Sequence, residues 1–158
     1  MLVIIGCGNP NRLDDGAGVY VAQELIKLLN ESPVPDVRVF DAGTSGMDIM
    51  FQARGCDALI IIDANQSDSD PGTVFEVPGS ELENIPMPSY NLHDFRWDNA
   101  LYAGRQIYKD DFPTNINVFL IEVESLDLGI GLSKPVQQAS DRVIELIMAK
   151  VKQYNKAT

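Results

Sequence analysis

The alternation of short apolar runs with segments of helical periodicity is the feature that most restricts how this sequence can fold. Met1 to Ile5 is a continuous apolar run that stops at Gly6, which is typical of a strand buried on both faces of a parallel sheet. The apolar residues that follow recur at intervals of three and four: Val19, Ala22, Leu25, Ile26 and Leu29. This spacing predicts a helix with one apolar face, so the chain begins with strand, loop and helix.

The same alternation continues to the carboxyl end of the sequence. Further strands are expected at Val37 to Phe40, Leu59 to Ile62, Val74 to Val77 and Val118 to Val123. Helices are expected around Met47 to Phe51, over Asn91 to Tyr108, and after an N-cap at Ser133. This pattern predicts the α/β class, with a doubly wound, mainly parallel five-stranded sheet that carries helices on both faces.

Length and charge limit the function classes. With 158 residues, 45% of them hydrophobic, residues 1–158 are expected to form one domain. A net charge of −11 repels phosphate backbones and anionic lipid, so we expect neither nucleic acid nor membrane as a partner. The first residues lack a basic region and the apolar run is too short to span a bilayer, which favours a cytoplasmic protein.

The first strand is followed by Gly6-Cys7-Gly8-Asn9, which resembles only the start of a dinucleotide-binding fingerprint. Asn11 stands where that fingerprint has its third glycine, and two carboxylates occupy the expected helix start, where a diphosphate needs free N–H groups. Asp41, after the second strand, does imitate a ribose-binding acid. A nucleotide-binding regulator therefore stays open as an alternative.

Two carboxylates and one imidazole are the candidates for chemistry. Asp14 is assigned to capping or bracing the loop and Asp15 to chemistry, although spacing alone does not separate the two. With a strand order of second, first, third, fourth, fifth, the segments carrying Asp15 and Asp63 face each other at the switch point, and the loop before His93 can close over them. Such a set can bind a divalent ion of the zinc, nickel or manganese type and leave positions open.

Several motifs follow one another in a characteristic order. They are Gly6 to Asn9 with Asp14-Asp15-Gly16 after it, Asp41 to Gly46, the strand ending in Asp63-Ala64, the single His93, and Glu124-Ser125-Leu126 followed by Gly129 to Ser133. In their order and spacing they resemble the hydrogenase maturation proteases, and the resemblance runs nearly end to end. It implies an α/β/α sandwich of three layers and a cytoplasmic endopeptidase that makes one cut.

The resemblance also implies a site and a substrate. Asp15, Asp63 and His93 match the metal-ligand positions and are the expected catalytic residues. The expected substrate is the large-subunit precursor of a nickel–iron hydrogenase, which loses its carboxyl-terminal extension after nickel insertion. Nickel, carried by the precursor, is then the recognition element, and zinc or cadmium are expected to take the same ligands in vitro.

Asn9, Gly43 and Thr44 lie on neighbouring strand-end loops. They are candidates for positioning the substrate or for donating to a developing oxyanion, and turn formation is their simpler interpretation. A nickel-handling accessory protein without hydrolytic activity is the other alternative function.

Overall fold

The computed structural model describes residues 1–82 and 96–157 of the chain. Its centre is a five-stranded sheet in the order β2-β1-β3-β5-β4. The strands are β1 (Leu2–Cys7), β2 (Val37–Gly43), β3 (Ala58–Asn65), β4 (Val74–Pro78) and β5 (Asn115–Glu122). The first three and β5 run parallel, and β4 pairs antiparallel with β5 at the edge.

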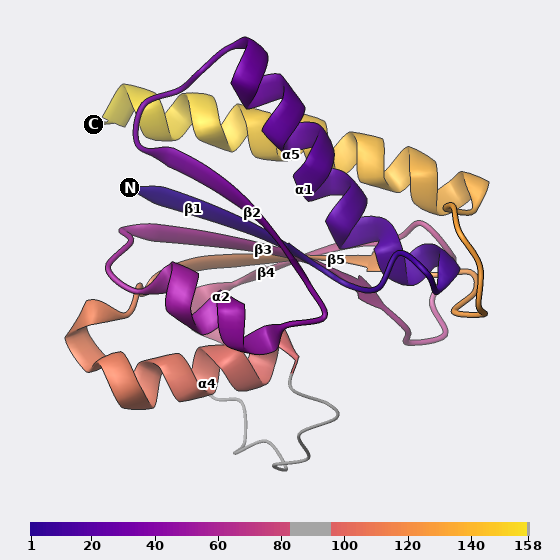
Figure 1. Ribbon diagram of the computed structural model, residues 1–158, viewed down its shortest axis with the longest axis horizontal. Coiled ribbons are helices and arrows are strands. Elements are labelled where there is room, and N and C mark those ends of the chain that lie inside the picture. The colour runs from indigo at the N-terminus through magenta and orange to yellow at the C-terminus, as the bar shows by residue number, and fades with distance from the viewer. Residues whose placement is uncertain (83–95, 158) are drawn as a thin grey trace.

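Helices cover both faces of this sheet, so the structure has the three layers of an α/β/α sandwich (Figure 1). One face carries α1 (Ala17–Glu31) and α5 (Lys134–Ala157), and the other carries α2 (Gly46–Ala53) and α4 (Trp97–Tyr108). The short helix α3 (Gly79–Leu82) and the 3-10 turns η1 (Leu13–Gly16) and η3 (Lys109–Asp111) lie in the connections. The expected fold class is confirmed.

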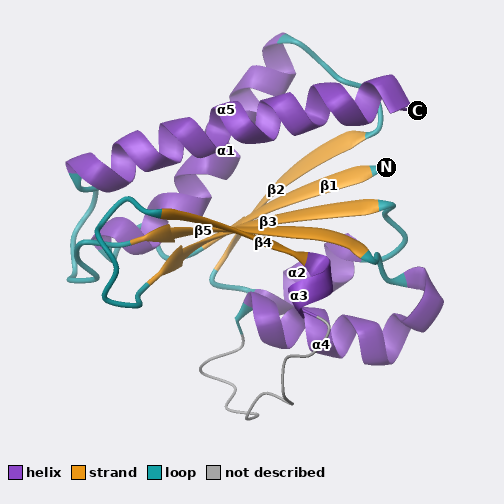
Figure 2. Cartoon of the chain, turned by 180° about the vertical axis from the view of Figure 1, so that it is seen from behind, coloured by secondary structure: helices purple, strands orange, loops and turns teal. Residues whose placement is uncertain are grey.

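Each face of the sheet has its own apolar core, and the side chains of β1 alternate between the two cores. Leu2 and Ile4 belong to the core beneath α1 and α5, whereas Val3 and Ile5 belong to the core beneath α2 and α4. Figure 2 shows these two pairs of helices on opposite sides of the sheet. All six residues of β1 are buried, as the uninterrupted apolar run predicts for a central strand. β1 and β3 therefore form a rigid support for the loops at their carboxyl ends.

The expected strand order, with β4 between β3 and β5, is wrong. Only residues 66–73 connect β3 to β4, and a crossover to a parallel neighbour needs about a dozen residues or more. β4 therefore turns back and runs antiparallel, and β5 takes the place beside β3. The adjacency of β1 and β3, on which the expected site depends, is unaffected.

Two strands also extend past the aspartates that were expected to end them. Asp41 pairs with Gly6 inside β2, and Asp63 pairs with Leu120 inside β3, because the neighbouring strands continue alongside. The expected helix start at Asn91 lies outside the described residues, and α4 as described begins at Trp97.

Helix α1 approaches the sheet very closely at two glycines. A Cβ atom on Gly6 would lie 2.1 Å from the Gly18 carbonyl oxygen, and one on Gly18 would lie 2.3 Å from the Cys7 carbonyl oxygen. Only glycine allows this contact, which brings the start of α1 directly against the ends of β1 and β3. Within the described part of the chain, no helix is long and apolar enough to cross a membrane.

Candidate active site

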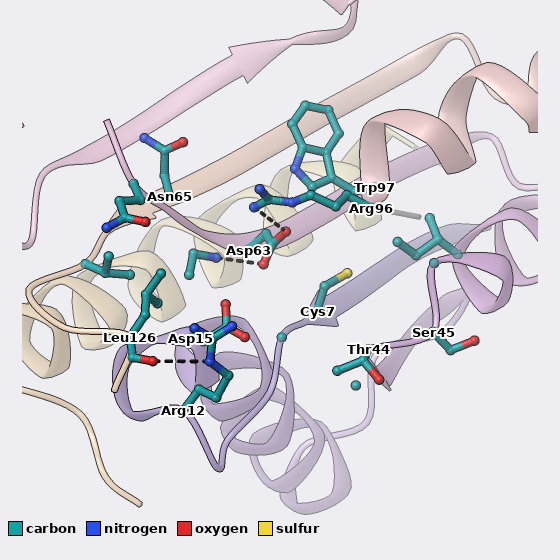
Figure 3. A pocket seen from close by; sticks show the side chains of 17 residues that line it. Cys7, Arg12, Asp15, Thr44, Ser45, Asp63, Asn65, Arg96, Trp97 and Leu126 are labelled. Carbon is teal, nitrogen blue, oxygen red and sulfur yellow. Dashed lines mark hydrogen bonds and ion pairs between the residues drawn. The ribbon is translucent and has the colours of Figure 1, made fainter. Parts of the chain in front are cut away.

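The carboxyl ends of β1, β2 and β3 open into a cavity of about 430 Å³ (Figure 3). Its walls come from four parts of the fold: the β1–α1 loop, the β2–α2 loop, the end of β3 with the start of α4, and the segment after β5. The residues used below are Cys7, Arg12, Asp15, Gly43, Thr44, Asp63, Asn65, Arg96, Trp97 and Leu126. The cavity therefore lies where ligands bind in open α/β sheets.

Asp15 enters this cavity from η1, the turn between β1 and α1. Its side chain is half-buried, and its Oδ2 atom accepts a hydrogen bond of 3.0 Å from the Asn9 backbone N–H. Among the described residues, this is the only hydrogen bond to the Asp15 carboxylate, so its Oδ1 atom remains available to a ligand. The loop between Asn9 and Asp15 thus fixes the direction of the acid without neutralising its charge.

Asp63 enters the same cavity from β3 and is only 6% exposed. Its Oδ1 atom accepts a hydrogen bond of 2.8 Å from the Ala64 N–H, and its Oδ2 atom lies 3.8 Å from Nη2 of Arg96. Burial is the main cause that raises the pKa of Asp63 to about 6. The Arg96 guanidinium and the Ala64 N–H partly offset that rise.

The two carboxylates are close enough to affect each other. The charge of Asp15 raises the pKa of Asp63, as does that of Asp98. Figure 3 shows Asp15 and Asp63 projecting from different elements into one space. Two facing carboxylates repel unless a cation lies between them, so the arrangement favours binding of a positive charge.

Asp14, next to Asp15, has a separate structural role. It is fully buried, and its Oδ1 atom accepts a hydrogen bond of 2.7 Å from the Ser133 N–H. Its Oδ2 atom accepts bonds from the Ser133 hydroxyl and from the N–H groups of Glu124 and Ser125. Asp14 therefore ties η1 to the segment between β5 and α5, and its assignment to loop bracing is confirmed.

The third expected ligand, His93, lies outside the described residues. Among residues 1–82 and 96–157, no three His, Cys, Asp or Glu side chains are grouped closely enough to hold a metal ion. Asp15 and Asp63 fit the role of two oxygen ligands, because both line an open cavity and each has one oxygen without a backbone partner. A complete metal site needs at least one further donor.

The three expected positioning residues differ in their placement. Gly43 and Thr44 line the cavity, but the Gly43 N–H already donates to Oδ1 of Asp41, which removes it as an oxyanion donor. Asn9 does not line the cavity; its side-chain oxygen accepts from the Asn11 N–H, and its backbone orients Asp15. Its placement favours support of the loop over direct contact with a substrate.

The cavity also contains two guanidinium groups that the sequence did not single out for the site. Arg12 donates through Nε to the Leu126 carbonyl oxygen at 3.2 Å, and Arg96 precedes α4 and faces Asp63. Arg12 follows the glycine-rich loop, and Arg96 lies three residues after His93, so proximity to expected site residues was the available signal. The cavity thus carries both signs of charge.

Asn65 is a further wall residue that the sequence did not indicate. Its Nδ2 atom donates to Oε2 of Glu122 at 2.7 Å, and the same carboxylate accepts a bond of 2.6 Å from the Ser67 N–H. These hydrogen bonds lower the pKa of Glu122 against the opposing effect of burial. Glu122 therefore holds the end of β3 and the following loop in place.

The features expected of a nucleotide site are used for other contacts. Asp41 accepts from the side chain of Gln23 and from the Gly43 N–H, so its carboxylate is already engaged. The space in front of α1 is filled by the η1 turn with its two aspartates. Both observations argue against a diphosphate at this helix start.

Comparison with known proteins identifies the family. The family model described as hydrogenase maturation protease matches residues 19–150. The chain belongs to the hydrogenase maturation protease family. A putative hydrogenase maturation protease of Methanocaldococcus jannaschii is 33% identical over 159 residues, which cover 96% of each chain. The hydrogenase 2 maturation protease of Escherichia coli is 27% identical over 96% of this chain and 91% of its own length.

The fold agrees with that of solved maturation proteases. The structure of the hydrogenase maturating endopeptidase HybD from Escherichia coli superposes with a TM-score of 0.77 at 25% identity. The match covers 97% of this chain and 93% of that one. As a member of the hydrogenase maturation protease family, the protein is an endopeptidase, and its reaction class is hydrolysis of a peptide bond.

Proposed function

We propose that this protease removes the carboxyl-terminal extension of a nickel–iron hydrogenase large-subunit precursor once nickel has been inserted. In this proposal nickel is part of the substrate, and Asp15, Asp63 and His93 hold it beside the scissile bond. Family membership supports the class of substrate. The presence of Asp15 and Asp63 in one open cavity is the observation that carries the site.

The described geometry supports a division of labour between the two acids. Asp63 is held on a buried strand by its bond to Ala64, so it can fix the position of the substrate's nickel relative to the sheet. Asp15 lies on a turn and is less buried, and its Oδ1 atom can complete the coordination of the metal from the side of the β1–α1 loop. Asp15 lies on η1, which follows β1, and Asp63 lies on β3, the neighbour of β1 in the sheet.

Peptide hydrolysis then needs an activated water and a stabilised carbonyl oxygen. The substrate's nickel can polarise the carbonyl as a Lewis acid, or a carboxylate of the site can accept a proton from the water. Thr44 lines the wall of the cavity that the β2–α2 loop forms, where it can contact the extension that is removed.

A processing assay tests the proposal. Nickel-loaded and nickel-free precursor are incubated with the purified protease, and we expect cleavage of the loaded form only. Asp15→Asn, Asp63→Asn and His93→Ala are each expected to abolish cleavage. The control is Asp48→Asn, which changes an exposed acid on α2 outside the cavity and should cleave normally.

The alternatives give different results in the same assay. Nickel retention without cleavage of either form would indicate an accessory role, and tight binding of ADP or NAD would indicate a nucleotide-binding regulator. Equal cleavage of loaded and nickel-free precursor would contradict recognition through nickel. The cytoplasmic location stays a prediction from the sequence.

A further inference from the structure

Arg96 is the cationic group that lies nearest to the Asp63 carboxylate in the described part of the chain. The distance between Nη2 and Oδ2 is 3.8 Å, and the Arg96 side chain is 59% exposed (Figure 3). Arg96 immediately precedes α4, whereas Asp63 is fixed in β3. The pair therefore joins an exposed, partly hydrated guanidinium to a buried carboxylate at the wall of the active-site cavity.

The two oxygens of Asp63 have different partners. Oδ1 accepts the 2.8 Å hydrogen bond from the Ala64 N–H, which belongs to the same strand and stays in place when a ligand enters. Oδ2 faces the cavity and the guanidinium. The oxygen of Asp63 that has no backbone partner is therefore the one that Arg96 faces.

We propose that Arg96 is a resident counterion of Asp63 that weakens the binding of free divalent cations at the site and yields more readily to a metal presented within the substrate protein. The proposal rests on the proposed function, because it takes Asp63 as a ligand of the substrate's nickel. A guanidinium and a divalent ion at one carboxylate oxygen repel each other, so binding of the ion requires displacement of Arg96. A free ion can offset that cost only through the ligands of the site itself, Asp15 among them. A folded precursor adds the contacts of its whole interface.

Arg96 is placed so that this displacement is possible. At 3.8 Å its contact with Asp63 is longer than a hydrogen bond, and its exposure lets the guanidinium turn into solvent without losing hydration. A shorter, buried ion pair would block the site permanently. The observed pair can therefore favour a metal held by the precursor over a free metal ion, and it leaves the cavity open.

Metal affinity measured by titration calorimetry tests this inference. We expect Arg96→Gln to bind free Ni²⁺ or Cd²⁺ roughly 3- to 10-fold more tightly than the wild-type protein. Arg96→Lys, which retains the positive charge, should bind like the wild type. Adding Asp63→Asn to Arg96→Gln should remove the gain, because the gain acts through that carboxylate.

The chain offers a matched control in Arg54. Its Nη2 atom lies 3.8 Å from Oδ2 of Asp111, and its side chain is also 59% exposed, but it does not line the cavity. Arg54→Gln should leave metal affinity unchanged. A second readout is inhibition of processing, since added free Ni²⁺ should inhibit Arg96→Gln at lower concentrations than it inhibits the wild type.

An affinity of Arg96→Gln no tighter than that of the wild type overturns the inference, whether or not the wild type binds metal. An equal gain for Arg54→Gln also overturns it, because the effect would then reflect net charge alone. Cleavage of nickel-loaded precursor by the same wild-type preparation shows separately whether the proposed function holds. A failure of the inference about Arg96 can therefore be distinguished from a failure of the proposed function.

Discussion

Two adjacent aspartates of this protease have different roles: Asp14 stabilises the fold, and Asp15 is placed for function. Asp14 is buried among four hydrogen-bond donors from the segment before α5, whereas the Asp15 carboxylate accepts one bond from the described residues and faces the cavity. A buried carboxylate that accepts several N–H bonds supports the fold, whereas an open carboxylate in a cavity is retained for binding. Each of the two therefore gives a different prediction.

Asp14→Asn should destabilise the protein by about 2 to 4 kcal/mol, because the amide NH₂ group would face backbone N–H donors and leave at least one of them unpaired. Asp15→Asn is the matched comparison and should change stability by less than about 1 kcal/mol while abolishing processing. Urea unfolding of both variants checks the difference. A larger loss for Asp15→Asn would reverse the roles assigned to the two residues.

Asp63→Asn should stabilise the metal-free protein near neutral pH. Folding raises the pKa of Asp63 from 3.8 to about 6, so the ionised wild type loses stability as pH rises through that interval. The variant should gain roughly 2 to 3 kcal/mol above pH 6 and little below pH 3.8. Its amide oxygen can still accept the Ala64 N–H.

Unfolding of both proteins with a chelator present, at pH 7.5 and at acidic pH, measures this difference. Asp48→Asn, an exposed acid, serves as the control and should show no such pH dependence. A stability difference between Asp63→Asn and wild type that is the same at both pH values would contradict the assigned cause.

The sequence indicated the two acidic residues of the cavity but not its two arginines. Asp15 and Asp63 could be singled out because each is an acid near the carboxyl end of an apolar run, and adjacent parallel strands bring such positions together. Arg12 lies in the same β1–α1 loop as Asp15, and Arg96 precedes α4, but the contacts of both arginines depend on how a loop and a helix start are oriented. Side-chain direction in such segments is set by tertiary packing, which has no local pattern.

Among the elements, α1 depends most strongly on one close contact. A Cβ atom on Gly18 would lie 2.3 Å from the Cys7 carbonyl oxygen and 2.4 Å from that of Ile62. Gly18→Ala should therefore destabilise the protein by about 3 kcal/mol or more, since α1 must move away from β1 and β3. The displacement should also move η1 and reduce processing.

Thermal unfolding and a processing assay on the Gly18→Ala variant check both effects. Asn30→Ala, at an exposed position of the same helix, is the control for a change in helix propensity and should leave both measurements near wild type. Normal stability of Gly18→Ala would mean that the helix tolerates a wider separation from the sheet.

The order of the elements was predictable, but the order of the strands in the sheet was not. Apolar runs and helical spacing identify the strands and helices one by one, because these signals are local. The place of β4 depends on its partner, and β4 pairs with β5, from Val118 to Ile121, far along the chain. The short connection 66–73 is the signal in the sequence that argues against a parallel crossover.

For the whole molecule, the two cores share one sheet, and this predicts a single cooperative unfolding transition. β1 contributes Ile4 to one core and Ile5 to the other, so neither face can unfold without exposing the second. The only tryptophan, Trp97, packs on the α2 and α4 face, whereas far-UV circular dichroism is dominated by the long helices α1 and α5.

Tryptophan fluorescence and circular dichroism should therefore give the same urea midpoint. This comparison also tests the expectation that residues 1–158 form one domain. A fluorescence transition at lower urea would show that the α2 and α4 face opens independently, and it would contradict the single-domain prediction.

The four donors to Asp14 also impose an order on how the protease is made. All of them belong to Glu124, Ser125 and Ser133, so a chain still on the ribosome leaves this carboxylate buried without partners, or exposed, until residues beyond 124 emerge. Because Asp15 is the next residue, its loop cannot be locked any earlier. The site for peptide-bond cleavage is therefore expected to form only after the chain has been synthesised past Ser133.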